Sequence, residues 1–589
     1  MPPAEQVEAT RQDNPLSKPG LRLLILIVIA AVVYQNSLPN GFTMDDGLYI
    51  TNNSQITQPS LGTLFAPHKA SNAFRPLTFI TFALNWAADP GPLGFHVVSL
   101  LLHAAVTSLL YLLLRELFES LQGGESLAFA AAILFAVHPI HTEAVASIVG
   151  RAELLAAGFI FAAWLFHLCD REILAIICFV LALFSKESAV AFLPLVLTGD
   201  YVRAHWKPLS RYLRLAGVTL LYVDLLWTVQ GRRFGQAGIS PLDNPLAQLP
   251  AGWRILNALR VAWKYIALQF YPARLSADYS FNEIAIYRDW MHTLPAAFAA
   301  LAVVIAWIWA IRSQRREWAL AGGIYFAGFA TTANILLPTG TIMGERLAYL
   351  PSAGFCLLLA LGWLWLKNRQ ETVATGIIVI AVAALGIRTI ARNSDWQNDF
   401  TLFSAAAQSA PGSAKAHTRL GDLYMAQQQL DLAESELQAA LRIYPGLPDA
   451  LADYGLLEFR RGNLQSAGRM METALNTSTR DNPNYDFMAV NFAAILMQTG
   501  HADAALDLLN REIDESPSYA RAWSNRALIR YQRGETNSAL TDARTALRLD
   551  PSNAEAGNLM LQFNPPTVAS SPARATPPIT RASQTGPAK

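Results

Sequence analysis

Long apolar runs alternate with short polar loops over residues 21–391 of this 589-residue chain. A helix that crosses a ~30 Å hydrocarbon layer needs roughly 20 such residues. Eleven runs come close to this length: 21–38, 95–115, 127–147, 152–169, 172–186, 187–202, 214–230, 292–312, 318–337, 346–366 and 372–391. A twelfth, 253–271, is interrupted by basic residues and predicts an interfacial or re-entrant helix. The pattern predicts an all-α, polytopic membrane bundle of about 11 spans.

Basic residues in the short loops predict the orientation, because Lys and Arg favour the cytoplasmic side. They gather in the N-terminal tail 1–20 and in the loops "RAHWKPLSRYLR", "RSQRRE" and "LKNRQ". These segments are therefore expected in the cytoplasm. The loop 39–94 is then the first extracytoplasmic loop, and eleven spans also leave the C-terminal part outside the cytoplasm.

Beyond residue 413 the pattern becomes amphipathic and repeats. Pro411, Pro445, Pro517 and Pro551 are spaced by 34, 72 and 34 residues, and small residues recur in step with them. A 34-residue period with small residues at fixed positions is typical of tetratricopeptide (TPR) repeats. We expect a junction or degenerate half-repeat at 392–412, four repeats over 413–556, and a disordered Pro- and Ser-rich tail at 564–589.

Composition narrows the class of protein. The chain is 52% hydrophobic and 15% charged, with a formal net charge of +1, whereas soluble domains carry about 25% charged residues. The charge balance and the lack of a basic tract argue against nucleic acid as a partner. The three cysteines lack the spacing of a zinc site or a disulfide framework, so we interpret them as packing residues.

Charged residues that are costly at membrane depth gather on the predicted extracytoplasmic face. They lie in the first loop and at the ends of spans: Asp45 and Asp46 in "TMDDG", Arg75 in "FRPL", His138, His141 and Glu143 in "HPIHTEAV", Arg151 and Glu153 in "GRAELL", Lys186 and Glu187 in "SKES", and Glu345 and Arg346 in "MGERLAYLPS". Each has an ordinary structural interpretation as a turn, headgroup anchor or solvated pair. Their convergence on one face favours a functional cleft.

Such a mixture suits transfer from a phosphate leaving group. A carboxylate can take the proton of an incoming hydroxyl as general base, while cations and imidazole donors stabilise the departing phosphate. His138 and His141 also suggest a metal, but Pro139 breaks the helix that would align them. We predict no metal site there and leave open a divalent cation, Mg²⁺ or Mn²⁺, near the acidic residues.

Several motifs together resemble the transmembrane and TPR-repeat-containing (TMTC-like) family of the GT-C glycosyltransferase superfamily. They are "TMDDGLYITNNSQI", "FRPLTFITFALNWA", "FAVHPIHTEAVASIVGRAELLAA", "SKES", "ARLSADYS", "GERLAYLPSAGFCLLL" and "RNSDWQNDFTLF", followed by the repeats. The resemblance covers roughly 20–556. It implies transfer of mannose from a polyprenyl-phosphate donor to Ser or Thr hydroxyls of an acceptor protein, outside the cytoplasm.

The resemblance also implies roles for the polar residues. The acidic pair corresponds to Asp45 and Asp46, with Asp45 favoured as the base. Arg75, His138, His141, Arg151, Lys186 and Arg346 are the expected phosphate contacts, and Glu143, Glu153, Glu187 and Glu345 would orient them. The family's animal members often have more repeats than this chain. This suggests a bacterial member in the inner membrane with periplasmic repeats, or an endoplasmic reticulum enzyme with lumenal repeats if eukaryotic.

Two other classes of function compete with this enzyme. One is a non-catalytic membrane scaffold whose repeats gather protein partners, and a TPR groove serves either role equally well. The other is a transporter for a lipid-linked sugar, which should place its charges near mid-span rather than at one face. Assaying the purified protein for donor hydrolysis or transfer separates scaffold from enzyme.

Overall fold

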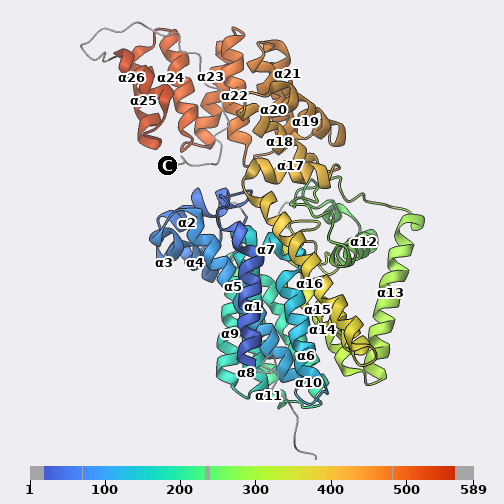
Figure 1. Ribbon diagram of the computed structural model, residues 1–589. Helices are drawn as coiled ribbons and strands as arrows, with labels where there is room; N and C mark the ends of the chain where they lie inside the picture. Colours follow the sequence, from blue (N-terminus) through green and yellow to red (C-terminus); the bar gives the residue numbers. More distant parts are fainter. Residues whose placement is uncertain (1–18, 69–70, 232–238, 481, 564–589) are drawn as a thin grey trace, which may run out of the picture. The chain divides into compact units, whose positions relative to one another are not determined.

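The computed structural model describes residues 19–68, 71–231, 239–480 and 482–563, and within these ranges the regular elements are all helices (Figure 1). This confirms the predicted all-α class. The chain divides into two compact units, residues 1–410 and 411–589. The predicted tail 564–589 and most of the N-terminal tail 1–20 lie outside the described residues.

The first unit contains the apolar helices. Its longer helices are α1 (Pro19–Tyr34), α4 (Pro76–Ala88), α5 (Pro92–Leu117), α6 (Gly124–Val137), α8 (Arg151–Leu168), α9 (Glu172–Ser185), α10 (Phe192–Arg203), α11 (Leu209–Val229), α12 (Ala251–Phe270), α13 (Trp290–Arg312), α14 (Arg316–Ala330), α15 (Ser352–Lys367), α16 (Glu371–Asn393) and α17 (Asp399–Ser409). Helices α5, α6, α8 and α15 pack together as the centre of its main apolar core. A Cβ at Gly354 would lie 2.4 Å from the carbonyl oxygen of Ala321, so α15 approaches α14 closely. Small residues permit such contacts between apolar helices.

The helices differ from the eleven predicted spans in length. Within the described residues, six helices are long and apolar enough to cross a membrane, or seven if α6 and the following turn, bent by 53°, form one span. Helices α9 and α15 have 14 and 16 residues, or about 21–24 Å at 1.5 Å per residue. Polar motifs interrupt the apolar runs, and the helices end there. Helix α12 is not among the candidate spans.

The second unit is built from helix pairs: α18 (Ala414–Ala426) with α19 (Leu430–Ile443), α20 (Pro448–Arg460) with α21 (Leu464–Thr477), α22 (Tyr485–Gln498) with α23 (Ala502–Glu515), and α24 (Ala520–Gln532) with α25 (Thr536–Leu549), followed by α26 (Ala554–Phe563). Gly462, Gly500 and Gly534 occupy the turns inside the last three pairs with φ of 79–84°. Glycine adopts this left-handed conformation without strain. In the first pair Gln428 takes it instead, at φ 61°.

We expect Gly421→Leu to destabilise the first helix pair by about 1–3 kcal/mol, the usual cost of overpacking a core. A Cβ at Gly421 would lie 2.8 Å from Cγ of the buried Leu437. Hydrogen exchange of peptides from α18 and α19 in the full chain measures the local stability. Gly557→Leu in α26 is the control, since a Cβ at Gly557 meets nothing within 4 Å. Equal protection in the two variants would contradict the packing argument.

Candidate functional site

The two adjacent aspartates have different surroundings. Asp46 is fully buried, and its two carboxylate oxygens accept hydrogen bonds from the backbone N–H of Thr43 at 2.9 Å and of Val149 at 3.0 Å. It thereby ties the loop after α1 to the turn before α8. Burial raises the pKa of Asp46 to about 7, although the two N–H donors act to lower it.

Asp45 is partly exposed and faces a cation. A third of its side chain is accessible, and Oδ2 lies 3.6 Å from Nη1 of Arg346. Arg346 belongs to a short helical turn, η8 (Glu345–Ala348), that precedes α15. Two residues distant in sequence therefore meet where both side chains are partly exposed.

Glu143 fixes Arg346 from the other side. Its buried carboxylate accepts from the backbone N–H of Arg346 at 2.9 Å and lies 3.0 Å from Nη1. Glu143 comes from the short helix α7 (Thr142–Ala146) after the bend at Pro139. This two-point contact orients the guanidinium, while 24% of the Arg346 side chain stays exposed.

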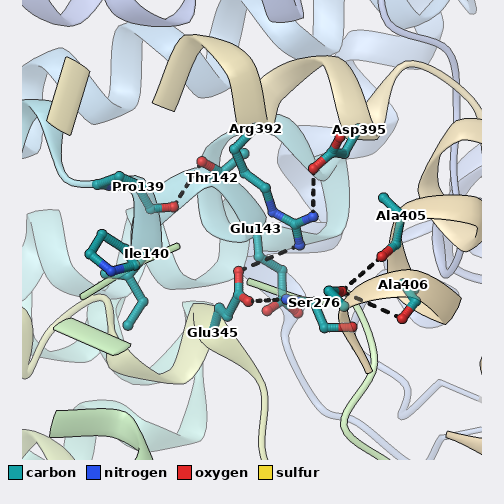
Figure 2. Close-up of polar contacts among 12 residues, drawn as sticks. Pro139, Ile140, Thr142, Glu143, Ser276, Glu345, Arg392, Asp395, Ala405 and Ala406 are labelled. Atoms are coloured by element: carbon teal, nitrogen blue, oxygen red, sulfur yellow. Dashed lines mark hydrogen bonds and ion pairs between the residues drawn. The ribbon is translucent and has the colours of Figure 1, made fainter. Parts of the chain in front are cut away.

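Glu345 points to a different set of partners, as Figure 2 shows. One oxygen accepts from the backbone N–H of Ser276 at 2.6 Å, and the other lies 3.7 Å from Nη2 of Arg392. The first oxygen also accepts from the hydroxyl of Tyr279 at 2.7 Å. Arg392 also donates to Asp395 at 2.8 Å. Glu345 is completely buried, and burial raises its pKa to about 7.

A second polar group lies where α9 ends. The buried ammonium of Lys186 is ion-paired with Glu153 in the first turn of α8. Arg75 makes a two-point contact with Glu187, at 2.6 and 3.0 Å. The sequence did not predict which acid meets which cation, and in the structure Lys186 pairs with Glu153 while the adjacent Glu187 pairs with Arg75.

Tyr49 links the two polar groups electrostatically. Burial raises the pKa of its phenol, Arg75 and Arg346 act to lower that pKa, and Asp45 acts to raise it. Tyr49 lies in a π-helical turn, η3 (Gly47–Thr51), directly after the aspartates. Charges from both groups therefore act on one residue of this turn.

The two histidines are buried and use protein partners. Nδ1 of His138 accepts from the N–H of Ile140 at 3.2 Å, so Nε2 is the donor to the carbonyl of Gln269 at 3.0 Å. Ser352 donates its hydroxyl to Tyr349, so Nε2 of His141 donates to Ser352 Oγ, at 2.6 Å. Both imidazoles hold helices together in this conformation.

The guanidinium of Arg151 is also hydrogen-bonded to groups inside the protein. Nη1 donates to Asn85 Oδ1 at 2.6 Å and Nη2 to the carbonyl of Phe95 at 3.0 Å, with the guanidinium 4.8 Å from the ring centroid of Phe82. No part of the side chain is exposed. The structure thus leaves Arg151, His138 and His141 away from the accessible surface, while Arg75 and Arg346 remain partly exposed.

Sequence reasoning missed several residues of this network, namely Ser276, Tyr279, Arg392 and Asp395. Their signal was present in the motifs "ARLSADYS" and "RNSDWQNDFTLF", which contain no conspicuous charged cluster. Among the described residues no group of three or more His, Cys, Asp or Glu side chains is arranged to hold a metal ion.

Comparisons with known proteins find relatives that match most of the chain and a family model for its repeats. A tetratricopeptide-repeat family model matches residues 401–448 and 491–554, which confirms the predicted repeats. Protein O-mannosyl-transferase F38B6.6 of Caenorhabditis elegans is 32% identical over 68% of this chain and 60% of its own length. TMTC3 of Mus musculus is 26% identical over 90% of this chain and 64% of its own length. Tmtc1 of Drosophila melanogaster is 28% identical over 72% of this chain and 61% of its own length. The chain thus spans less than two thirds of these relatives.

Solved structures resemble the chain more distantly. MamA is 18% identical, with a TM-score of 0.23, over 26% of this chain and 89% of its own. The Cut9–Hcn1 hetero-tetramer is 16% identical, with a TM-score of 0.26, over 76% of this chain and 90% of its own.

The raised pKa of Asp46 predicts how stability depends on pH. Because the folded-state pKa of about 7 exceeds the ordinary 3.8, the protonated group contributes stability that is complete below pH ~4 and is lost as pH rises through about 7. The loss approaches about 1.4 kcal/mol per pH unit within this window. Asp46→Asn removes the titration but places an amide NH₂ against a backbone donor, so it lowers stability at pH 5.

Thermal unfolding in detergent at pH 5, 6, 7 and 8 measures the difference between wild type and Asp46→Asn. We expect this difference to narrow as pH rises. Asp89→Asn, at an exposed carboxylate in the same loop, is the control substitution. A difference that widened with pH would mean that the ionised form of Asp46 is the stabilising one.

Proposed function

The chain is a relative of the TMTC-type protein O-mannosyl-transferases, and we propose that it is a membrane glycosyltransferase of GT-C type acting on proteins. The donor is a polyprenyl-phosphate sugar, with mannose the favoured sugar, and the acceptor is a Ser or Thr hydroxyl. The relatives' printed names supply the transferase class. The observation that carries the chemistry is the approach of Asp45 to Arg346 at a partly exposed position.

Asp45 acts as the general base in this proposal. Its carboxylate accepts the proton of the acceptor hydroxyl while the hydroxyl oxygen forms a bond to the anomeric carbon of the sugar. The bond between that carbon and the phosphate oxygen breaks, and the polyprenyl phosphate leaves with the electron pair. Asp45 suits the role better than Asp46 because both oxygens of Asp46 are occupied by backbone donors.

Arg346 and Arg75 bind the phosphate in this mechanism. Each is partly exposed and is held by a carboxylate, Glu143 or Glu187, which leaves other N–H groups of the guanidinium for a ligand. A planar guanidinium matches phosphate oxygens well. Lys186 supplies a positive charge from a buried position beside Glu153. His138, His141, Arg151 and Glu345 have no contact with the phosphate in this proposal and hold the surrounding helices and loops through their protein partners.

The membrane helices and the repeats have separate tasks in the proposal. The apolar helices hold the polyprenyl tail, which needs a lipid-like surface. The repeats recruit the acceptor protein, since stacked TPR helices form a concave surface suited to peptides. The site and the repeats then share the extracytoplasmic side, in the periplasm of a bacterium or the lumen of the endoplasmic reticulum.

Asp45→Asn should reduce transfer by about 10²–10⁴-fold, the usual contribution of a general base. The amide keeps the shape of the side chain but cannot accept the proton. Mannose transfer from a short-chain polyprenyl-phosphate mannose to the total protein of a cell lysate provides the assay, with donor hydrolysis followed in parallel. Asp89→Asn is the matched control. Full activity in Asp45→Asn would remove this assignment, and an inert wild type would favour the scaffold.

Arg346→Lys tests the phosphate contact. Lysine keeps the charge but lacks the planar fork that meets Glu143, Asp45 and a phosphate together. We expect the rate of transfer to fall at least tenfold with the chain still folded, as judged by gel filtration in detergent. Arg369→Lys is the control, because Arg369 stacks on Trp365 and lies outside the site. A transfer rate that is unchanged in Arg346→Lys, or that falls equally in Arg369→Lys, would contradict the assignment.

A further inference from the structure

The segment 392–399 runs from the end of α16 to the start of α17, and it makes several hydrogen bonds to the end of α1 and to the loop that carries Asp45. Nδ2 of Asn393 donates to the carbonyl of Val33 at 2.9 Å and to Asn36 at 2.8 Å. In return Nδ2 of Asn40 donates to the carbonyl of Asn393 at 3.1 Å, and the N–H of Gly41 donates to the carbonyl of Gln397 at 2.9 Å. The two segments are more than 300 positions apart, so this network joins the ends of the first unit.

The last contact of the network reaches the residue before Asp45. The backbone N–H of Met44 donates to Oδ1 of Asp399 at 2.8 Å. Met44 has a φ of +51°, the left-handed conformation, which non-glycine residues seldom adopt without external contacts. Asp399 is the first residue of α17, so its backbone is fixed by a helix. The carboxylate therefore stabilises an unfavourable backbone conformation immediately before the proposed base.

We propose that Asp399 is a positioning residue that holds Met44 left-handed and thereby directs the Asp45 carboxylate toward Arg346. The inference rests on the proposed function for its catalytic meaning, but its structural content stands apart from any substrate. Two hydrogen bonds between Thr43 and Asp46 also span Met44. Without the Asp399 contact they alone restrain the turn, so Met44 enters negative φ more often and the direction of the chain changes at Asp45. Asp46 remains tied to Val149, so the change concentrates on Asp45.

Four variants test the inference in the full chain. Asp399→Ala removes the acceptor, whereas Asp399→Asn retains an oxygen that can accept from Met44. Met44→Gly supplies a residue that enters the left-handed region without strain, and the double variant Asp399→Ala with Met44→Gly asks whether backbone freedom replaces the contact. Asp289→Ala is the matched control, because that exposed carboxylate accepts a backbone N–H at the start of α13 without touching the loop.

Two measurements are made on each variant in detergent: hydrogen exchange of peptides covering 41–49, and kcat and KM for a short-chain polyprenyl-phosphate mannose. For Asp399→Ala we expect faster exchange and a fall in kcat of about 10²-fold, comparable to a misplacement of about 1 Å, with a smaller change in KM. Asp399→Asn should keep most of the wild-type kcat. The double variant should regain at least several-fold of the loss, while Asp289→Ala leaves both readouts unchanged.

The outcomes separate the inference from the proposed function. Unchanged exchange over 41–49 in Asp399→Ala, or a double variant as slow as Asp399→Ala alone, would overturn the positioning role. If the wild type transfers no sugar but Asp399→Ala still loosens 41–49 and Asp399→Asn does not, the contact stands and the proposed function fails.

Discussion

The pairing of the buried carboxylate of Glu143 with Arg346 is the contact on which the site depends. Removing a charge from water costs several kcal/mol unless a well-placed opposite charge compensates. Glu143 is almost entirely buried and receives both a backbone N–H and a guanidinium Nη from Arg346. The double contact fixes the direction of the guanidinium, and Asp45 then lies beside it at the surface. Any rearrangement of Arg346 would leave Glu143 buried without its partner.

The other charged side chains are also paired inside the protein, and they differ in how much of each side chain stays exposed to a ligand. Lys186 and Arg392 are paired with acids and almost inaccessible, and Arg151 is enclosed by carbonyls and aromatic rings. Arg75 and Arg346 are paired but 18% and 24% exposed. A phosphate can reach a cation only where some of its surface remains free. In the proposed function a phosphate would therefore meet Arg75 and Arg346, while the remaining cations stabilise the fold around them.

The repeats leave a more regular pattern in the sequence than the membrane helices do. Proline and small residues recur at fixed spacing because each helix pair repeats the same contacts, as at Gly421 against Leu437. Apolar runs hold less information, since a run does not show where its helix begins: the predicted run 346–366 includes part of "GERLAYLPS", whereas α15 begins at Ser352. The sequence singled out Asp45, Asp46 and several cations as candidates, and their roles stay predictions. The residues alone do not distinguish Asp45 from Asp46, which only the resemblance separated, or an exposed arginine from Arg151. Hydrogen-bond partners distant in the chain decide both differences.

The polar motifs that shorten the apolar helices also build the site. At "HPIHTEAVASIVGR" the chain bends by 53° at Pro139, and the turn is so tight that a Cβ at Gly150 would lie 2.5 Å from the carbonyl oxygen of Ala144. After the bend the short helix α7 carries the carboxylate of Glu143 to Arg346, and a second break at Ser147 leaves the N–H of Val149 for Asp46. The interior of a straight helix could not supply that N–H, because its backbone N–H groups are bonded within the helix. Irregular backbone inside an apolar bundle is tolerated where other protein groups satisfy it. The interruptions of the apolar helices thus bring residues that are far apart in sequence to the aspartate loop. There Arg346 supplies charge and Val149 supplies a backbone donor.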